Sequence, residues 1–554
     1  MRPSASARAG GSRDAGVVRV AFGPLADRRS LLDRAHRGDI VGALGRVASA
    51  DTGPRGSLRR RLVTLLAVTG PGMVVLVADN DAGGIATYAQ AGQDYGLDLL
   101  WLLVLLAAAL LVNQEMVGRL GAVTGAGHAR LIYERFGRRW GAFALSDLLV
   151  VNFLVIVTEF IGVAFGLGYF GVSRYVSVPL AAAALIALPV TGSFRRWERA
   201  MYVLVAVSLA AVPLIVLARH PAAPAAVTPV PGHGVPGGTV LVIIALIGTT
   251  VAPWQLFFQQ SNVVDKRITA RWLGYERAET AIGTALFAVG AVAVMAACAL
   301  AFSGTPFHGA YLNAGAVASA LRRAAGPWAG ALFAVVLLNG SVLGAAAVTL
   351  SSSYAIGDVT GTKHSLHRSW RDARRFHGSY AGLAGLAAGV VLIPAAPLGI
   401  VTTSVQALAG VLLPSALVFL LLLCNDQAVL GPWVNPGWLN VIAGGLVAVF
   451  LVLSGALVAS TLVPGLEAGW PAVAAGVAGA GIAGGIGGFR LTVRPPAPGA
   501  GAAGQCVWTM PAIESLPAPA ASRARTAGLV VLRGYLVLAA AVVVIKAVRL
   551  MFGS

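Results

Sequence analysis

Apolar segments of membrane-spanning length recur along this chain of 554 residues and constrain its fold more than any other feature. A helix needs about 20 residues to cross the ~30 Å hydrocarbon core of a bilayer. Thirteen such segments are expected, at residues 62–92, 97–117, 143–171, 175–192, 199–218, 238–263, 279–303, 328–355, 379–397, 400–424, 437–461, 468–487 and 528–549. With 57% hydrophobic and only 11% charged residues, the sequence predicts an all-α polytopic membrane protein.

The basic residues predict how these segments are oriented. Alternate loops are rich in Arg and Lys, at residues 119–139, 195–199, 266–277 and 363–375, whereas the loops between them carry few. Because cytoplasmic loops are enriched in basic residues, we expect a cytoplasmic N-terminus in the cell (plasma) membrane. The net charge of +19 then reflects membrane anchoring, and no nucleic acid partner is expected.

Composition divides the chain into five regions. We expect a disordered basic cytoplasmic arm at residues 1–60, a core of about eleven helices at 61–465, and a Gly/Ala-rich twelfth helix at 466–490. A flexible linker at 491–526 and an additional C-terminal helix at 527–554 complete the expected organisation.

The three cysteines lie too far apart for a disulfide framework or a metal cluster. No arrangement of catalytic residues is evident, so an enzyme is not expected.

The first apolar segment is interrupted by "DNDAGG" at residues 79–84. Asp79 and Asn80 compete for backbone hydrogen bonds, and paired glycines lower helix propensity. Burying a carboxylate costs several kcal/mol, and the predicted cores of the broken spans contain no Arg or Lys as a partner for Asp81. A bound cation is the partner we expect. The alternative is that Asp79 or Asp81 only caps the half-helix that follows.

The sixth apolar segment is interrupted in a comparable place by "GTTVAPWQLFFQQ" at residues 248–260. Pro253 removes a backbone donor and disfavours helix at Ala252, while Thr249 and Thr250 can satisfy freed carbonyl groups. Two broken helices in corresponding positions are typical of inverted-repeat transporters, whose substrate site lies where the breaks face each other.

These phrases resemble the NRAMP family of divalent-metal transporters. The resemblance covers roughly residues 60–460 and is carried, in the family's order, by "IATYAQAGQDYG", "GAVTGAGHARLIYERFGRRWG", "TEFIG", "GTTVAPWQL" and "SVQALAGVLLPSAL". It implies a LeuT-type fold with two inverted five-helix repeats, followed here by extra C-terminal helices.

The resemblance also implies site residues in the first, third and tenth spans. Asp81 matches the family's metal-binding aspartate, and Gln406 matches a glutamine that joins the metal shell in some states. Gly84 stands where the family has a metal-binding Asn. Glu159 matches a family acid and is a candidate proton or ion relay, but Ile156 replaces an Asp associated with proton movement.

The sixth span departs from the family pattern at three positions. Ala252 replaces a metal-binding Met, and Trp254 and Gln259 replace two histidines. Trp254 either fills volume in the core or lines the ion cavity. Gln255 and Gln259, four residues apart on one helical face, either hydrate a passing ion or bond within the bundle.

The remaining candidate ligands are all oxygen atoms. They are the Asp81 carboxylate, backbone carbonyls at Ala78 and Thr249, and the side chains of Thr250 and Gln406, with Asp79 and Asn80 lining the site. A roomy oxygen site without a thioether suits Mg²⁺, and also Mn²⁺. The pattern is closest to the NRAMP-related magnesium transporter branch, which implies transport by alternating access without proton coupling.

Two alternatives remain open. The first is a proton-coupled Mn²⁺/Fe²⁺ importer of the ordinary NRAMP kind, with Glu159 carrying the proton. The second, an organic-substrate symporter on the same fold, is disfavoured by the carboxylate of Asp81 at the break. The expected partners are the divalent metal substrate and the lipid bilayer, with no cofactor besides the transported ion. The sequence indicates no oligomeric state.

Overall fold

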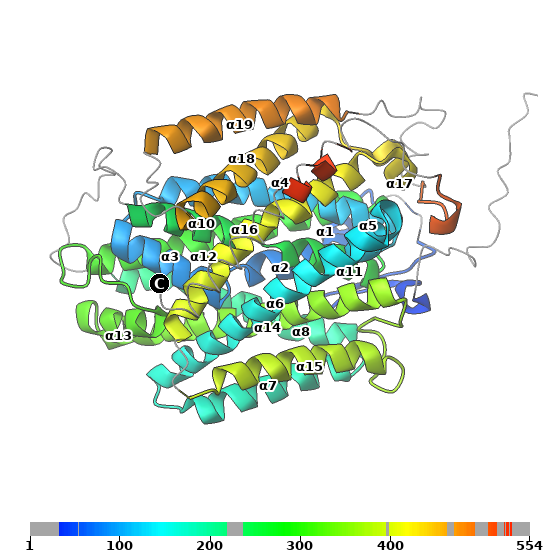
Figure 1. Cartoon of the computed structure of the whole chain (residues 1–554). Coiled ribbons are helices and arrows are strands. Elements are labelled where there is room, and N and C mark those ends of the chain that lie inside the picture. Colours follow the sequence, from blue (N-terminus) through cyan, green and yellow to red (C-terminus); the bar gives the residue numbers. More distant parts are fainter. Residues whose placement is uncertain are drawn as a thin grey trace, which may run out of the picture.

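The computed structural model is a bundle of helices (Figure 1). It describes residues 33–51, 53, 55–218, 237–394, 398–462, 470–492, 508–517, 526, 528–530 and 532–534. The first part of the bundle contains α1 (Leu58–Val68), α2 (Pro71–Ala78), α3 (Ala82–Tyr95), α4 (Leu100–Thr124), α5 (His128–Phe136), α6 (Arg138–Tyr169), α7 (Arg174–Val190), α8 (Phe194–Ser208) and α9 (Ala211–Leu217). The second contains α10 (Gly237–Thr250), α11 (Pro253–Asp265), α12 (Leu273–Phe302), α13 (Ala314–Ala324), α14 (Pro327–Thr360), α15 (Arg374–Val391), α16 (Leu398–Cys424), α17 (Gln427–Leu430), α18 (Gly437–Leu462) and α19 (Trp470–Arg490).

The prediction of an all-α polytopic membrane protein is confirmed. Within the described residues, eight helices are long and apolar enough to cross a membrane, or nine if the bent pair α1 and α2 counts as one span. The only strands described are β1 (Ile40–Val41) and β2 (Arg46–Val47), which form one short antiparallel hairpin.

Both predicted helix breaks are present. The first span is divided at residues 79–81 into α2 and α3, and the sixth is divided at residues 251–252 into α10 and α11. The expected start of the first span at residue 62 is wrong, because residues 58–68 form the separate helix α1, bent by 56° from α2. α1 is followed by Thr69, whose backbone is not helical (ψ 134°), and Pro71 begins α2, so the corner lies between them.

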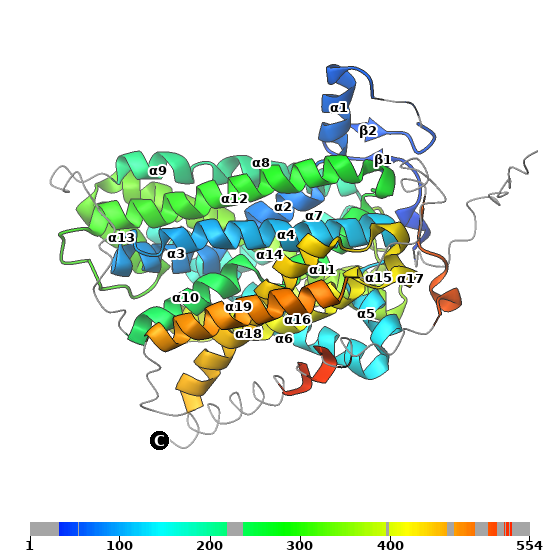
Figure 2. The same ribbon diagram turned by 90° about the horizontal axis from the view of Figure 1, so that it is seen from above.

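The broken helices lie inside the bundle (Figures 1 and 2). α12 packs against α2, α3 and α4, while α14 packs against α6 and α11, so the two breaks are covered from both sides. α7 and α15 lie together on one flank, and α18 and α19 pair on another. All residues of α11 are buried, which explains how its many polar side chains avoid lipid.

Two expected disordered regions contain packed residues. Within the arm at 1–60, residues 33–50 form a 3₁₀ turn (Arg34–His36) and the β1–β2 hairpin, and Asp33 is buried. Within the linker at 491–526, a 3₁₀ turn at Ile513–Ser515 accompanies a buried Met510. Neither packed stretch is predictable from local sequence, because the partners lie elsewhere in the chain. Most of the expected helix at 527–554 lies outside the described residues.

Candidate metal site

Asp81 ends the first break and caps the helix that follows it. Its backbone is extended (φ −78°, ψ −176°), and its Oδ1 accepts a hydrogen bond from the Gly84 backbone N–H at 2.6 Å. The capping role considered from the sequence is therefore present. Capping uses Oδ1 from one side only, so it does not exclude a cation ligand role for this buried carboxylate.

Gly84 is closely surrounded by oxygen atoms, and its lack of a side chain allows their approach. A Cβ atom at residue 84 would lie 2.7 Å from the Asp79 carbonyl oxygen, 3.2 Å from Thr249 Oγ1 and 3.3 Å from Asp81 Oδ1. These three oxygens belong to both broken spans. We call this group of oxygens the Gly84 cradle.

The second break supplies further oxygens at the same depth. Ala252 is extended (φ −93°, ψ 145°), and Pro253 begins α11. The hydroxyl groups of Thr249 and Thr250 are buried and have no hydrogen-bond partner in the described part of the chain. Orphaned buried hydroxyls are unfavourable, and a cation with its bound water would satisfy them.

Gln406 reaches the first break from α16. A Cβ atom at Gly83 would overlap the Gln406 side chain, so the amide lies directly against the backbone before the Gly84 cradle. The Gln406 Nε2 is buried without a partner in the described residues. Ala78, the last residue of α2, is also fully buried at this break.

Asp79 and Asn80 point in different directions. The Gln255 amide donates to Asp79 Oδ1, while Asp79 Oδ2 has no partner among the described residues. The Asn80 amide instead donates to the Phe287 carbonyl on α12, 3.2 Å away. The structure therefore brings Asp79 and Gln255 together at the break and turns the Asn80 amide group toward α12.

Trp254 packs against a residue of its own helix, whereas Gln259 contacts the neighbouring helix α12. The Trp254 ring is 1% exposed and meets Phe258 edge to face at 6.2 Å, which supports the core-packing interpretation. The Gln259 amide donates to Glu276 at 2.7 Å and to Thr280 at 3.1 Å. Gln259 thus bonds within the bundle, on the side of α11 that faces α12.

Glu159 lies beside Asp81. Its Oε2 accepts a hydrogen bond from the Ala82 N–H at 3.0 Å, which takes the place of a helical bond across the break. A Cβ atom at Gly344 would approach both Asp81 Cβ (2.7 Å) and Glu159 Oε2 (2.8 Å). Two buried acids therefore lie side by side, with Glu159 Oε1 unpartnered within the described part of the chain.

Sequence reasoning missed Tyr88 and Gln114. Tyr88, two helical turns after Asp81, is fully buried beside Thr249 and Thr250, and its hydroxyl, like theirs, has no hydrogen-bond partner among the described residues. Gln114 on α4 donates to Gln255 Oε1 at 3.1 Å and so supports the residue that holds Asp79. In the sequence, the signal for each residue is a polar side chain within an otherwise apolar span.

The sequence matches a known protein family. Residues 72–460 match the family described as natural resistance-associated macrophage protein-like, or Nramp. The chain belongs to the Nramp family. The match begins at α2 and ends within α18, so it includes both helix breaks.

Individual Nramp relatives support the assignment over most of the chain. The divalent metal cation transporter MntH of Burkholderia ambifaria is 28% identical over 449 residues, covering 77% of this chain and 95% of that protein. MntH of Verminephrobacter eiseniae is 32% identical over 226 residues, but this match spans only 38% of this chain and 49% of that protein.

A solved structure confirms the fold. The Eremococcus coleocola manganese transporter, in complex with an aromatic bis-isothiourea substituted compound, superposes with a TM-score of 0.60. The two chains are 20% identical, and the match covers 80% of this chain and 98% of the other. The predicted LeuT-type fold is thereby confirmed.

Proposed function

We propose that this Nramp protein carries divalent metal cations across the cell membrane by alternating access, with Mg²⁺ and Mn²⁺ as substrates and without proton coupling. The carriage of divalent metals is supported by relatives named divalent metal cation transporters and by the manganese transporter of the same fold. The preference for Mg²⁺ and the absence of coupling are inferred from the site.

The observation that carries the proposal is the Gly84 cradle. It presents a carboxylate, a backbone carbonyl and a hydroxyl oxygen, and it lacks side-chain volume. In our proposal Gln406, Thr250 and the carbonyl oxygens of Ala78 and Thr249 complete the ligand set around the ion and its waters. Mg²⁺ dehydrates reluctantly and is usually bound by one or two carboxylates with several waters, so a site of hard oxygen donors suits it.

The lack of a thioether also favours a hard cation. Ala252, at the second break, contributes only a methyl group where the resemblance expects a methionine. Sulfur ligands favour softer transition metals, whereas carboxylate, carbonyl and water suit Mg²⁺ and Mn²⁺. An inside-negative potential would supply about 4.6 kcal/mol per 100 mV to a doubly charged ion, so uptake needs no coupled proton.

One observation favours the alternative of proton-coupled Mn²⁺/Fe²⁺ import. Glu159 lies beside Asp81, and two adjacent buried carboxyl groups favour retention of a proton. Metal binding at Asp81 would then displace that proton through Glu159. The two candidate functions therefore differ both in the metal that is carried and in whether a proton is carried with it.

Uptake into proteoliposomes tests the proposal. Mg²⁺ or Mn²⁺ is offered outside under a negative inside potential, with a pH-sensitive dye enclosed. Entry of both metals without internal acidification is expected. Acidification that accompanies Mn²⁺ entry, with no entry of Mg²⁺, would reject the proposal in favour of the proton-coupled alternative.

A further inference from the structure

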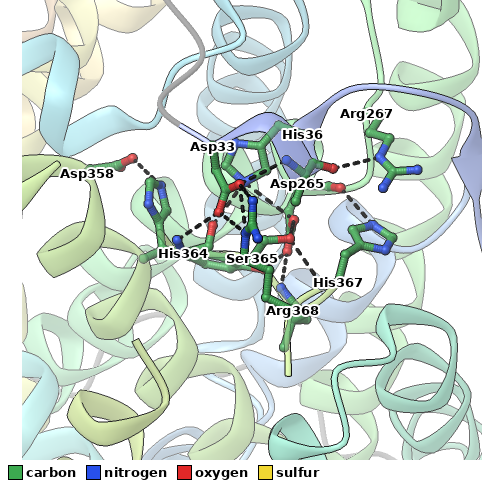
Figure 3. Close-up of polar contacts among 12 residues, drawn as sticks. Asp33, His36, Asp265, Arg267, Asp358, His364, Ser365, His367 and Arg368 are labelled. Atoms are coloured by element: carbon green, nitrogen blue, oxygen red, sulfur yellow. Dashed lines mark hydrogen bonds and ion pairs between the residues drawn. The ribbon is translucent and has the colours of Figure 1, made fainter. Parts of the chain in front are cut away.

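The N-terminal segment 33–47 lies across one end of the bundle and is bonded to helices that are distant in sequence (Figures 2 and 3). Asp33 is 1% exposed, and Arg368 donates to its carboxylate from Nε at 2.8 and 2.9 Å and from Nη2 at 2.6 Å. The His364 N–H donates to the same carboxylate at 3.1 Å. This first anchorage joins the segment to the loop that follows α14.

A second anchorage holds the end of α11. Arg267 donates from Nε to the Ala35 carbonyl and from Nη1 to the Asp39 carbonyl, each at 2.9 Å. Arg267 adopts a left-handed conformation with a φ of 68°, which is uncommon for a residue other than glycine. His36 Nε2 lies 3.0 Å from the His364 carbonyl oxygen and 3.5 Å from Asp265 Oδ1 (Figure 3).

A third anchorage reaches the start of α2. The Ala43 N–H donates to Glu198 of α8, and Glu198 forms a fully buried ion pair of 2.5 Å with Lys266 at the end of α11. Lys266 also donates to the Thr69 carbonyl, immediately before α2. The segment is thus bonded to α8, to the end of α11 and to the loop after α14, and it reaches Thr69 only through Glu198 and Lys266.

The segment also bridges a recess between α11 and α14. This small cavity of about 10 Å³, room for about one water molecule, is lined by His36 of the segment, by Ser261 of α11 and by Asp358 of α14. Ser261 Oγ and Asp358 Oδ2 are buried without partners in the described part of the chain. Within the described residues, two buried polar atoms, one on each helix, are therefore unsatisfied where the segment joins them.

We propose that residues 33–47 are an autoinhibitory strap, which holds this end of the transporter closed and must detach before the end can open. The inference rests on the proposed transport by alternating access. In this architecture one group of helices rocks against the other around a fixed site. Because the strap is bonded to Arg267 at the end of α11, which carries one of the breaks, and also to α8 and the α14 loop, separation of these elements would break its bonds.

The charge of the main anchor persists across the physiological pH range. Burial raises the pKa of Asp33, but hydrogen bonds from Arg368 and the Ala35 N–H lower the pKa to about 2 overall. A substitution that removes Arg368 would leave this carboxylate buried without its charged partner, which is strongly unfavourable. Loss of either side chain should therefore free the strap.

Two release variants and a matched control test the inference. Arg368→Gln and Asp33→Asn each weaken the strap, whereas Arg46→Gln removes an exposed ion pair to Asp39 that lies within the hairpin. Initial rates of Mn²⁺ uptake into proteoliposomes are compared with rates of trypsin cleavage at Arg34 in detergent. We expect both release variants to be cleaved faster and to transport severalfold faster, and Arg46→Gln to match the parent protein.

A reversible cross-link tests the same strap in the opposite direction. Asp33→Cys and Arg368→Cys, in a background without the native cysteines, are joined by a bis-methanethiosulfonate reagent. Uptake should fall on cross-linking and recover when reductant cleaves the link. Release variants that are cleaved faster but transport no faster than the parent would overturn the inference. A parent that carries no divalent cation would instead overturn the proposed function.

Discussion

Asp81 Oδ1 lies 2.6 Å from the Gly84 backbone nitrogen and 3.3 Å from the position of a Cβ atom at that residue. One carboxylate oxygen therefore both caps α3 and lies among the oxygens that closely surround the glycine. This relationship joins the local structure of the break to the proposed ion site. It also means that changes at either residue alter the site in distinct, measurable ways.

Asp81→Asn should reduce the initial rate of Mg²⁺ uptake by about a hundredfold, equivalent to ~2.7 kcal/mol. Asparagine can keep the capping hydrogen bond from the Gly84 N–H, so the helix should remain intact while the negative charge is lost. Uptake of Mg²⁺ and thermal unfolding are measured together, with the exposed Asp98→Asn as control. Near-normal uptake by the Asp81 variant would remove this residue from the site.

Gly84→Ala should raise the KM for Mg²⁺ by about tenfold, or ~1.4 kcal/mol. The added methyl group would lie 2.7 Å from the Asp79 carbonyl oxygen and would occupy the cradle itself. Gly168→Ala is the control, because a Cβ atom there meets nothing within 4 Å. Equal KM values for Gly84→Ala and the parent protein would show that the ion does not bind in this cradle.

Ala252→Met should shift selectivity toward Mn²⁺ over Mg²⁺ by about tenfold, or ~1.4 kcal/mol. The thioether would add a soft ligand at the second break, and Mn²⁺ accepts such a ligand more readily than Mg²⁺ does. The ratio of uptake rates for the two metals is the measurement. Ala252→Leu controls for side-chain volume, and an identical shift in both variants would attribute the effect to bulk.

Glu159→Gln should leave Mg²⁺ uptake within about threefold of the parent rate, a difference of less than 1 kcal/mol. Glutamine can still accept the Ala82 hydrogen bond, but it cannot release a proton. Uptake is followed across a range of external pH. A large loss of Mn²⁺ uptake, together with loss of its pH dependence, would support a proton-carrying role.

Lys266→Met should lower the free energy of unfolding by about 3–5 kcal/mol. Lys266 is fully buried, and its loss would leave the Glu198 carboxylate unpaired among apolar residues. Thermal unfolding in detergent is compared with that of Arg277→Gln, which removes a partly exposed ion pair with Glu115 worth about 0–1 kcal/mol. Similar unfolding temperatures for the two variants would mean that the buried pair contributes little.

The sequence allowed prediction of the helical class and of both breaks, because these depend on local features. Paired glycines after Asp81 and the proline at residue 253 interrupt apolar segments within a few residues. Hydropathy also predicts most spans. It does not separate α1 from α2, because the apolar character of the sequence continues through the corner at Gly70.

The contacts between distant residues could not be predicted. Arg368 lies 335 residues from Asp33, and nothing near either residue indicates their pairing. The direction of Asn80, toward α12, depends likewise on a carbonyl group 207 residues away. Periodicity and local motifs carry no information on such partners, so the packing of residues 33–47 within the expected arm is not predictable from the sequence.

The most direct test of the cation site is an anomalous difference map from crystals of this protein soaked in Mn²⁺. The account predicts one peak in the Gly84 cradle, within coordination distance of Asp81, and no such peak in crystals of Asp81→Asn. A peak elsewhere in the bundle, with the cradle empty at saturating Mn²⁺, would contradict the account.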